Sequence, residues 1–149
     1  MAMTDLKYKE LNSGDALSEV IRYISQDKIN LYAEAVGDFN PIHVDESYAA
    51  QTAFGGTVAH GMLILAYISE MMTGVFGDSW FSNGRLNVRF KAPARCQDTV
   101  TVSGKVDSIK SVDGNIDFIC SVNCVNQRQE VVVTGGATVR VILHNQEKL

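Results

Sequence analysis

The chain has 149 residues, of which 46% are hydrophobic and 20% charged, and its formal net charge is −4 at pH 7. These values are typical of one globular domain with a substantial core. They lack the basic excess with which proteins bind nucleic acid or an anionic membrane, so we expect neither as a partner. We expect a single domain over residues 6–142, with flexible termini at 1–5 and 143–149.

The first residues carry charges and no long apolar segment, and the longest apolar run is too short to span a bilayer. The three cysteines stand at irregular spacing, which argues against a disulfide framework. Free thiols are typical of a reducing compartment. We therefore expect a cytoplasmic protein.

The first half of the chain is predicted to be mostly helical. Residues 16–23 alternate well enough for one strand. Ser25 can cap a helix that Gly37 ends, because serine is favoured before a helix and glycine directly after it. A second, short helix is predicted over 45–50, with an aspartate as its cap.

The second half predicts one buried helix and several strands. Residues 61–73 are apolar nearly all round, which is typical of a helix inside the core. Alternating stretches at 86–90, 100–106, 116–124 and 131–142 predict four strands, and strands joined by short turns pair antiparallel. We therefore predict an α+β domain in which a curved antiparallel sheet wraps the helix and buries it on all sides.

Asp38 and His43 flank an Asn-Pro break and are candidates for acid–base chemistry. Pro41 forces Asn40 out of the helical region, so we expect residues 38–43 to form a fixed, non-helical segment after the first helix. A carboxylate and an imidazole in such a segment can hold and deprotonate one water molecule. The alternative is ordinary turn chemistry, because Asp, Asn and Pro are all common turn residues.

Gly61 begins the apolar helix. A helix N-terminus has free N–H groups and a partial positive charge, which could stabilise an oxyanion forming on a carbonyl group. Because glycine has no side chain, a substrate carbonyl could approach closely; the alternative is merely a tight start of the helix. With the acid–base pair, this position indicates water chemistry on an acyl substrate.

The stretch 32–50 resembles the signature of the MaoC-like dehydratases, the family of the (R)-specific enoyl-CoA hydratases. It reads YAEAVGDFNPIHVDESYAA and contains the family's Gly-Asp-x-Asn-Pro-x-His-x-Asp pattern. Val36 stands where many members carry Ser, Thr or Cys, a difference that affects no catalytic position. The resemblance covers about residues 6–142 and implies a single hotdog domain.

The resemblance also implies an activity, the reversible hydration of a trans-2-enoyl thioester to the (R)-3-hydroxyacyl thioester. It implies that Asp38 and His43 hold the catalytic water, that the Gly61 N–H polarises the thioester carbonyl, that Ser69 lines the site and that Asn40 holds the loop. Ser69 could instead hydrogen-bond back to its own helix. The resemblance implies no metal or redox cofactor, and CoA or phosphopantetheine enters only as part of the substrate. It also implies a homodimer or a larger assembly.

A basic run surrounds the first strand of the second half, at Arg85, Arg89, Lys91 and Arg95. The default interpretation is a solvated strand face. The functional alternative is attraction of the phosphates of CoA or of an acyl carrier protein, and on it Arg89 and Lys91 are predicted to bind substrate. The histidines show no metal-ligand spacing, so no metal site is predicted.

Two other functions remain open. A hotdog thioesterase would use Glu70, the only charged residue of the apolar helix, whereas a non-catalytic acyl-thioester binder would need no acid–base pair. His60 is expected to have a structural packing role. Segment 74–84, with Phe76, Trp80 and Phe81, is predicted to form part of the pocket wall.

Overall fold

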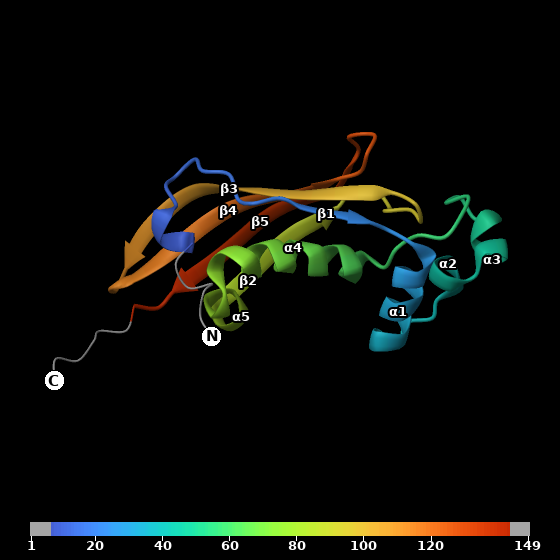
Figure 1. The fold of residues 1–149 in the computed structure, drawn as a ribbon, viewed down its shortest axis with the longest axis horizontal. Helices are drawn as coiled ribbons and strands as arrows, with labels where there is room; N and C mark the ends of the chain where they lie inside the picture. Colours follow the sequence, from blue (N-terminus) through green and yellow to red (C-terminus); the bar gives the residue numbers. More distant parts are fainter. Residues whose placement is uncertain (1–6, 144–149) are drawn as a thin grey trace.

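A computed structural model describes residues 7–143, so the termini predicted to be flexible lie outside the described residues, apart from Leu143. Within this range the chain forms one 3₁₀ helix, five α-helices and five strands (Figure 1). In chain order they are η1 (Lys7–Glu10), β1 (Val20–Tyr23), α1 (Gln26–Val36), α2 (Pro41–Val44), α3 (Glu46–Ala50), α4 (Gly61–Phe76), α5 (Asp78–Asn83), β2 (Gly84–Phe90), β3 (Thr99–Val112), β4 (Asn115–Val125) and β5 (Val131–Val141).

The five strands form one antiparallel sheet in the order β1-β3-β4-β5-β2. β3 and β4 are joined by Asp113-Gly114, whose φ angles of 50° and 78° suit the two-residue turns that match strand twist. β1 and β2 are the edges, and β2 pairs with β5 alone. The four strands predicted in the second half are confirmed and are antiparallel. Pairing of consecutive strands holds for β3 with β4 and β4 with β5, but it was wrong for the first of the four, because β2 pairs with β5 and residues 91–98 separate it from β3. The strand predicted at 16–23 is shorter, because its first part makes only an isolated bridge from Ala16 to β3.

Helix α4 lies along one face of the sheet, with α1, α2 and α3 gathered at its N-terminal end and α5 at the other (Figure 1). One side of α4 packs into the core, through Leu63, Ile64, Ile68, Met71, Met72, Val75 and Phe76. The opposite side is open: Met62 is 61% exposed, and Ala66, Glu70 and Thr73 follow it on the same stripe. The α+β prediction is confirmed, but burial of the helix on all sides was wrong, because the sheet covers only one of its faces.

The caps predicted for the first helices are confirmed. The Ser25 side chain accepts the N–H of Lys28, and Gly37 ends α1 with the left-handed angles φ 74° and ψ 22°. Asp45 caps α3 by accepting the N–H of Tyr48. Helix α5 was not predicted.

None of the helices in residues 7–143 combines the length and the apolar character that crossing a bilayer requires. All three cysteines are free thiols, with Cys120 and Cys124 buried and Cys96 partly exposed. Cys120 and Cys124 face the core from β4, in agreement with the alternation predicted for 116–124.

Candidate active site

Asp38 lies directly after the left-handed glycine that ends α1. Its amide donates to the carbonyl of Ala33 at 3.2 Å, and its Oδ1 accepts the N–H of Asn40 at 3.1 Å. Because the left-handed cap reverses the chain and these two bonds hold the turn, the carboxylate has a defined direction. Its second oxygen, Oδ2, is the one nearer to His43, and the side chain is 51% exposed.

The next turn of chain is a short helix, α2, and it carries His43. Asn40 caps this helix, because its Oδ1 accepts the N–H of Ile42 at 3.2 Å. The prediction of a non-helical segment through His43 was therefore wrong from Pro41 onward. Proline breaks a helix interior but is favoured at the first helical position, where its missing N–H costs nothing. The predicted loop-holding role of Asn40 corresponds to this cap.

The imidazole of His43 is 8% exposed and fixed from behind. Its Nδ1 lies 2.7 Å from the carbonyl oxygen of Val58, which can only accept, so we assign the proton of the neutral ring to Nδ1. Gln26 holds the backbone by donating to the carbonyl of His43 at 2.8 Å. The free nitrogen, Nε2, then faces Asp38.

Nε2 of His43 and Oδ2 of Asp38 are 3.9 Å apart. This distance is too long for a direct hydrogen bond and suits a bridging water. Two hydrogen bonds of about 2.8 Å would meet at the water oxygen at about 90°. The predicted carboxylate–imidazole pair is therefore assembled with room for one water between its two free atoms.

Gly61 lies beside this pair at the N-terminus of α4. The preceding residue, His60, is the helix cap but makes no side-chain cap hydrogen bond, so the first N–H groups of α4 have no side-chain acceptor there. A hollow of about 400 Å³ brings these features together, lined by Tyr32, Val36, Asp38, His43, His60, Gly61 and Met62. Acid–base groups and a helix N-terminus thus face one space.

A second hollow, of about 320 Å³, shares Gly61 with the first as a lining residue. Its walls include Phe54, Ala59, Ile64, Phe90, Lys91 and Val132. A Cβ atom at Gly61 would lie only 2.9 Å from Cε1 of Phe90, so a side chain there would displace that ring. Gly61, at the start of α4, therefore borders both hollows.

His60 belongs to the site, which the sequence interpretation missed by giving it only a packing role. Its ring is 3% exposed and stacks on the ring of His43, with centroids 3.8 Å apart and planes inclined by 24°. Its Nε2 lies 2.9 Å from the backbone oxygen of Asp38. The only clue in the sequence is its position directly before Gly61.

Asp38, His43 and His60 place three possible metal-ligand atoms within 4.8 Å of one another, a grouping that their sequence spacing does not suggest. The two imidazoles are stacked and nearly parallel. Ring lone pairs lie in the ring planes, so two such rings cannot both direct a lone pair at one ion, as tetrahedral coordination requires. The ring geometry thus favours the prediction of no metal, which stays a prediction.

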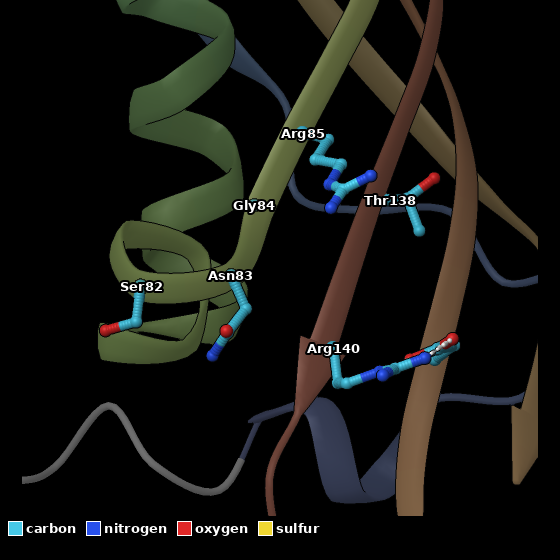
Figure 2. A pocket seen from close by; sticks show the side chains of 7 residues that line it. Ser82, Asn83, Gly84, Arg85, Thr138 and Arg140 are labelled. Carbon is cyan, nitrogen blue, oxygen red and sulfur yellow. Dashed lines mark hydrogen bonds and ion pairs between the residues drawn. The ribbon is translucent and has the colours of Figure 1, made fainter. Parts of the chain in front are cut away.

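The basic run is divided among separate places. Arg85 lies beside Thr138 near the C-terminal end of α4, in a hollow where Arg140 pairs with Asp117 (Figure 2). Arg89 alternates with Phe90, so it lies on the sheet face away from α4. Of the two residues predicted to bind substrate here, only Lys91 lines a hollow that reaches Gly61.

Three further predictions are not supported by the geometry. Ser69 is eight residues along α4 from Gly61, about 12 Å at helical rise, and lines neither hollow. Glu70 is ion-paired with Arg22 on the open side of α4. Segment 74–84 lies at the far end of the helix, where Phe76 and Trp80 belong to the core and Phe81 is 91% exposed.

An antiparallel sheet laid over one long helix, with an acid–base pair beside the helix N-terminus, defines a hotdog protein equipped for water chemistry on a carbonyl compound. The chain belongs to the MaoC-like domain family, whose model matches residues 12–128.

Known proteins similar to this chain have consistent names. The chain is 31% identical to an (R)-specific enoyl-CoA hydratase of Rhodospirillum rubrum over 134 residues, 90% of each protein. It is 32% identical to a 3-hydroxybutyryl-CoA dehydratase of Methylorubrum extorquens, over 95% of this chain and 80% of that one. Among solved structures, the R-hydratase PhaJ1 of Pseudomonas aeruginosa, unliganded, superposes with a TM-score of 0.79 at 28% identity, covering 97% of this chain and 96% of that one.

Proposed function

We propose that this protein catalyses the reversible hydration of a trans-2-enoyl thioester to the (R)-3-hydroxyacyl thioester. One observation carries the proposal: the 3.9 Å gap between Asp38 Oδ2 and His43 Nε2, in a hollow that also contains the start of α4 at Gly61. The gap suits the water that is added, and the helix N-terminus suits the negative charge that develops on the thioester carbonyl oxygen. The names of the relatives supply the thioester and the R configuration.

In the hydration direction, Asp38 is the base that removes a proton from the water, and the water oxygen forms its bond to C3 of the enoyl group. The electron pair of the C2–C3 double bond moves toward the thioester carbonyl. A proton on Nε2 of His43 then passes to C2. Because Nδ1–H is committed to Val58, Nε2 carries a proton only in the imidazolium form. Transfer of the proton from Asp38 to His43, through a new water in the gap, restores both groups.

Gly61 stabilises the enolate between these two steps. Its backbone N–H, the first of α4, is proposed to donate to the thioester oxygen, where negative charge develops. Neither step needs a metal or redox cofactor, and we propose that CoA or phosphopantetheine enters only as part of the substrate. Lys91, which lines the second hollow, is the proposed contact for that carrier group.

The two alternative functions have less support. A thioesterase acting through Glu70 would require an acid that is here ion-paired with Arg22 and lies outside both hollows. A non-catalytic binder would have no use for a carboxylate and an imidazole held so that their free atoms face one another. Both alternatives make predictions that one assay separates.

The test is hydration of crotonyl-CoA, monitored through the loss of the enoyl absorbance. The configuration of the 3-hydroxy product is then determined. Longer enoyl-CoAs and carrier-bound enoyl groups extend the assay, and a thiol reagent detects any release of free CoA. We expect saturable formation of the R product without thiol release. Thiol release would instead support the thioesterase, and a folded protein without turnover on any of these substrates would support the binder.

We further propose that the protein forms a homodimer, or a larger assembly of such dimers, in a reducing cytoplasm. The edge of β2 that pairs with no strand of residues 7–143 and the open face of α4 support the assembly, because proteins cover unpaired strand edges and exposed apolar stripes. The three free thiols support the reducing compartment. Sedimentation equilibrium tests the assembly: a monomer at all concentrations would contradict it.

A further inference from the structure

His60 makes two contacts with the acid–base pair, although it lies outside the motif that contains that pair. It stands directly before Gly61, and its side chain reaches back 22 residues to the turn at Asp38. The ring is 3% exposed, so it is enclosed by the groups it contacts. A buried polar side chain in such a place needs a physical reason.

The first contact fixes the backbone of the base. Nε2 of His60 lies 2.9 Å from the backbone oxygen of Asp38. A carbonyl only accepts, so Nε2 carries the proton and donates it. This bond ties the turn that orients the Asp38 carboxylate to the residue directly before α4.

The second contact fixes the face of the imidazole. The ring of His60 stacks on that of His43, at 3.8 Å between centroids and 24° between planes. Val58 already holds one edge of the His43 ring through Nδ1. With an edge bonded and a face covered, that ring can direct Nε2 only toward Asp38.

The remaining nitrogen of His60 indicates that stability alone does not explain the residue. Nδ1 is buried and has no hydrogen-bond partner among the described residues. An unpaired buried nitrogen is unfavourable, and an apolar ring of similar size would avoid it. What an apolar ring could not replace is the hydrogen bond from Nε2 to the backbone of Asp38, beside the stack on the ring of His43.

We propose that His60 is a positioning residue, which holds Asp38 by its backbone and His43 by its ring so that their free atoms remain one water apart. The inference rests on the proposed hydration reaction. His60 touches no reacting atom; it acts through the two residues that do, and it links them to Gly61 because it is the neighbouring residue in the chain.

Three substitutions separate the two contacts. His60→Ala removes both, His60→Phe keeps a ring for stacking without the donor, and His60→Gln keeps a donor without the ring. Ile68→Val is the matched control, because Ile68 is fully buried on α4, the helix that follows His60, and lies about two turns from its start. Its lost methyl group lowers stability without touching the site.

The kinetic expectation is a loss in kcat rather than in KM. His60→Ala should lower kcat on the order of 100-fold, since small misplacements of reacting groups cost that much. KM should change by less than about twofold, because His60 acts on the chemical step through the positions of Asp38 and His43. The Phe and Gln variants should each recover part of the loss. A kcat within about twofold of wild type in folded His60→Ala, or a rise in KM alone, would overturn the inference.

A second measurement does not depend on activity. Carbon-13 relaxation of the Cε1–H bond of His43 reports the mobility of its ring. We expect a rigid ring in the wild type and in Ile68→Val, and a mobile one in His60→Ala. A ring that stays equally rigid in His60→Ala refutes the positioning role, whereas absent hydration by the wild type refutes the proposed function, so the two failures are distinguishable.

Discussion

Replacing Asp38 by asparagine tests the proposed base with little disturbance of the fold. The Asn side chain keeps an oxygen that can accept the N–H of Asn40, so the turn should remain. The atom that changes is Oδ2, which becomes an NH₂ group and presents donors where the water needs an acceptor. Because the side chain is 51% exposed, we expect the free energy of unfolding to change by less than about 0.5 kcal/mol.

The expected loss is in the chemical step. General-base catalysis contributes about 10²- to 10⁴-fold, so the barrier should rise by about 2.7 to 5.4 kcal/mol and kcat should fall by that factor. Asp45→Asn is the matched control: Asp45 also follows a helix and accepts a backbone N–H, at 3.0 Å from Tyr48, but it lines neither hollow. It should leave kcat unchanged.

The double variant Asp38→Asn/His43→Gln adds a test of joint action. If the two residues acted independently, their losses would multiply to about 10⁴- to 10⁸-fold. Because both hold one water, we expect the double variant to be hardly worse than the more damaged single variant. The crotonyl-CoA hydration assay is run on the wild type, Asp38→Asn, His43→Gln and the double variant, and thermal unfolding checks that each is folded. Asp38→Asn with kcat within tenfold of wild type, or fully multiplicative losses, would refute the shared-water mechanism.

Three further predictions concern other parts of the molecule. Gly61→Ala should lower kcat about 10- to 100-fold, because the new Cβ would lie 2.9 Å from the Phe90 ring at the proposed carbonyl site; Phe90→Leu in the same chain should restore activity, and no restoration would contradict a steric cause. Glu70→Gln should leave hydration within about twofold of wild type in the same assay, since Glu70 lines neither hollow. Burial raises the pKa of the Cys120 and Cys124 thiols to about 11, which leaves about one thiolate in a thousand at pH 8. Titration with a thiol reagent should therefore find at most one reactive thiol in the native protein and three after denaturation; two or more in the native protein would contradict the burial.

Local sequence patterns predicted much of the fold because they act over short distances. Ser25, Gly37 and Asp45 cap their helices through bonds that span only a few residues, and the structure confirms all three. The alternation of 116–124 likewise survives in β4, since a strand's two faces follow from its own residues. Pro41 was misjudged because one residue type can both end a helix and begin one.

Long-range packing could not be predicted in the same way. The stack of His60 on His43 depends on how the loop before α4 returns to α2, and no periodicity encodes that path. The open side of α4 was missed because an apolar sequence predicts that a helix is covered but does not show what covers each of its faces. Arg89 was assigned to the substrate although strand alternation, once the register is known, directs it to the opposite face.

The two hollows share Gly61 but otherwise have different walls. The first contains Asp38 and His43 at the end of α1 and on α2, whereas the second is formed largely by the end of β2 and the loop that follows it. On the proposed function, substitutions in the second set of residues would alter which acyl or carrier group is accommodated without moving Asp38 and His43. Such a division would let related enzymes diverge in substrate range during evolution while retaining one reaction.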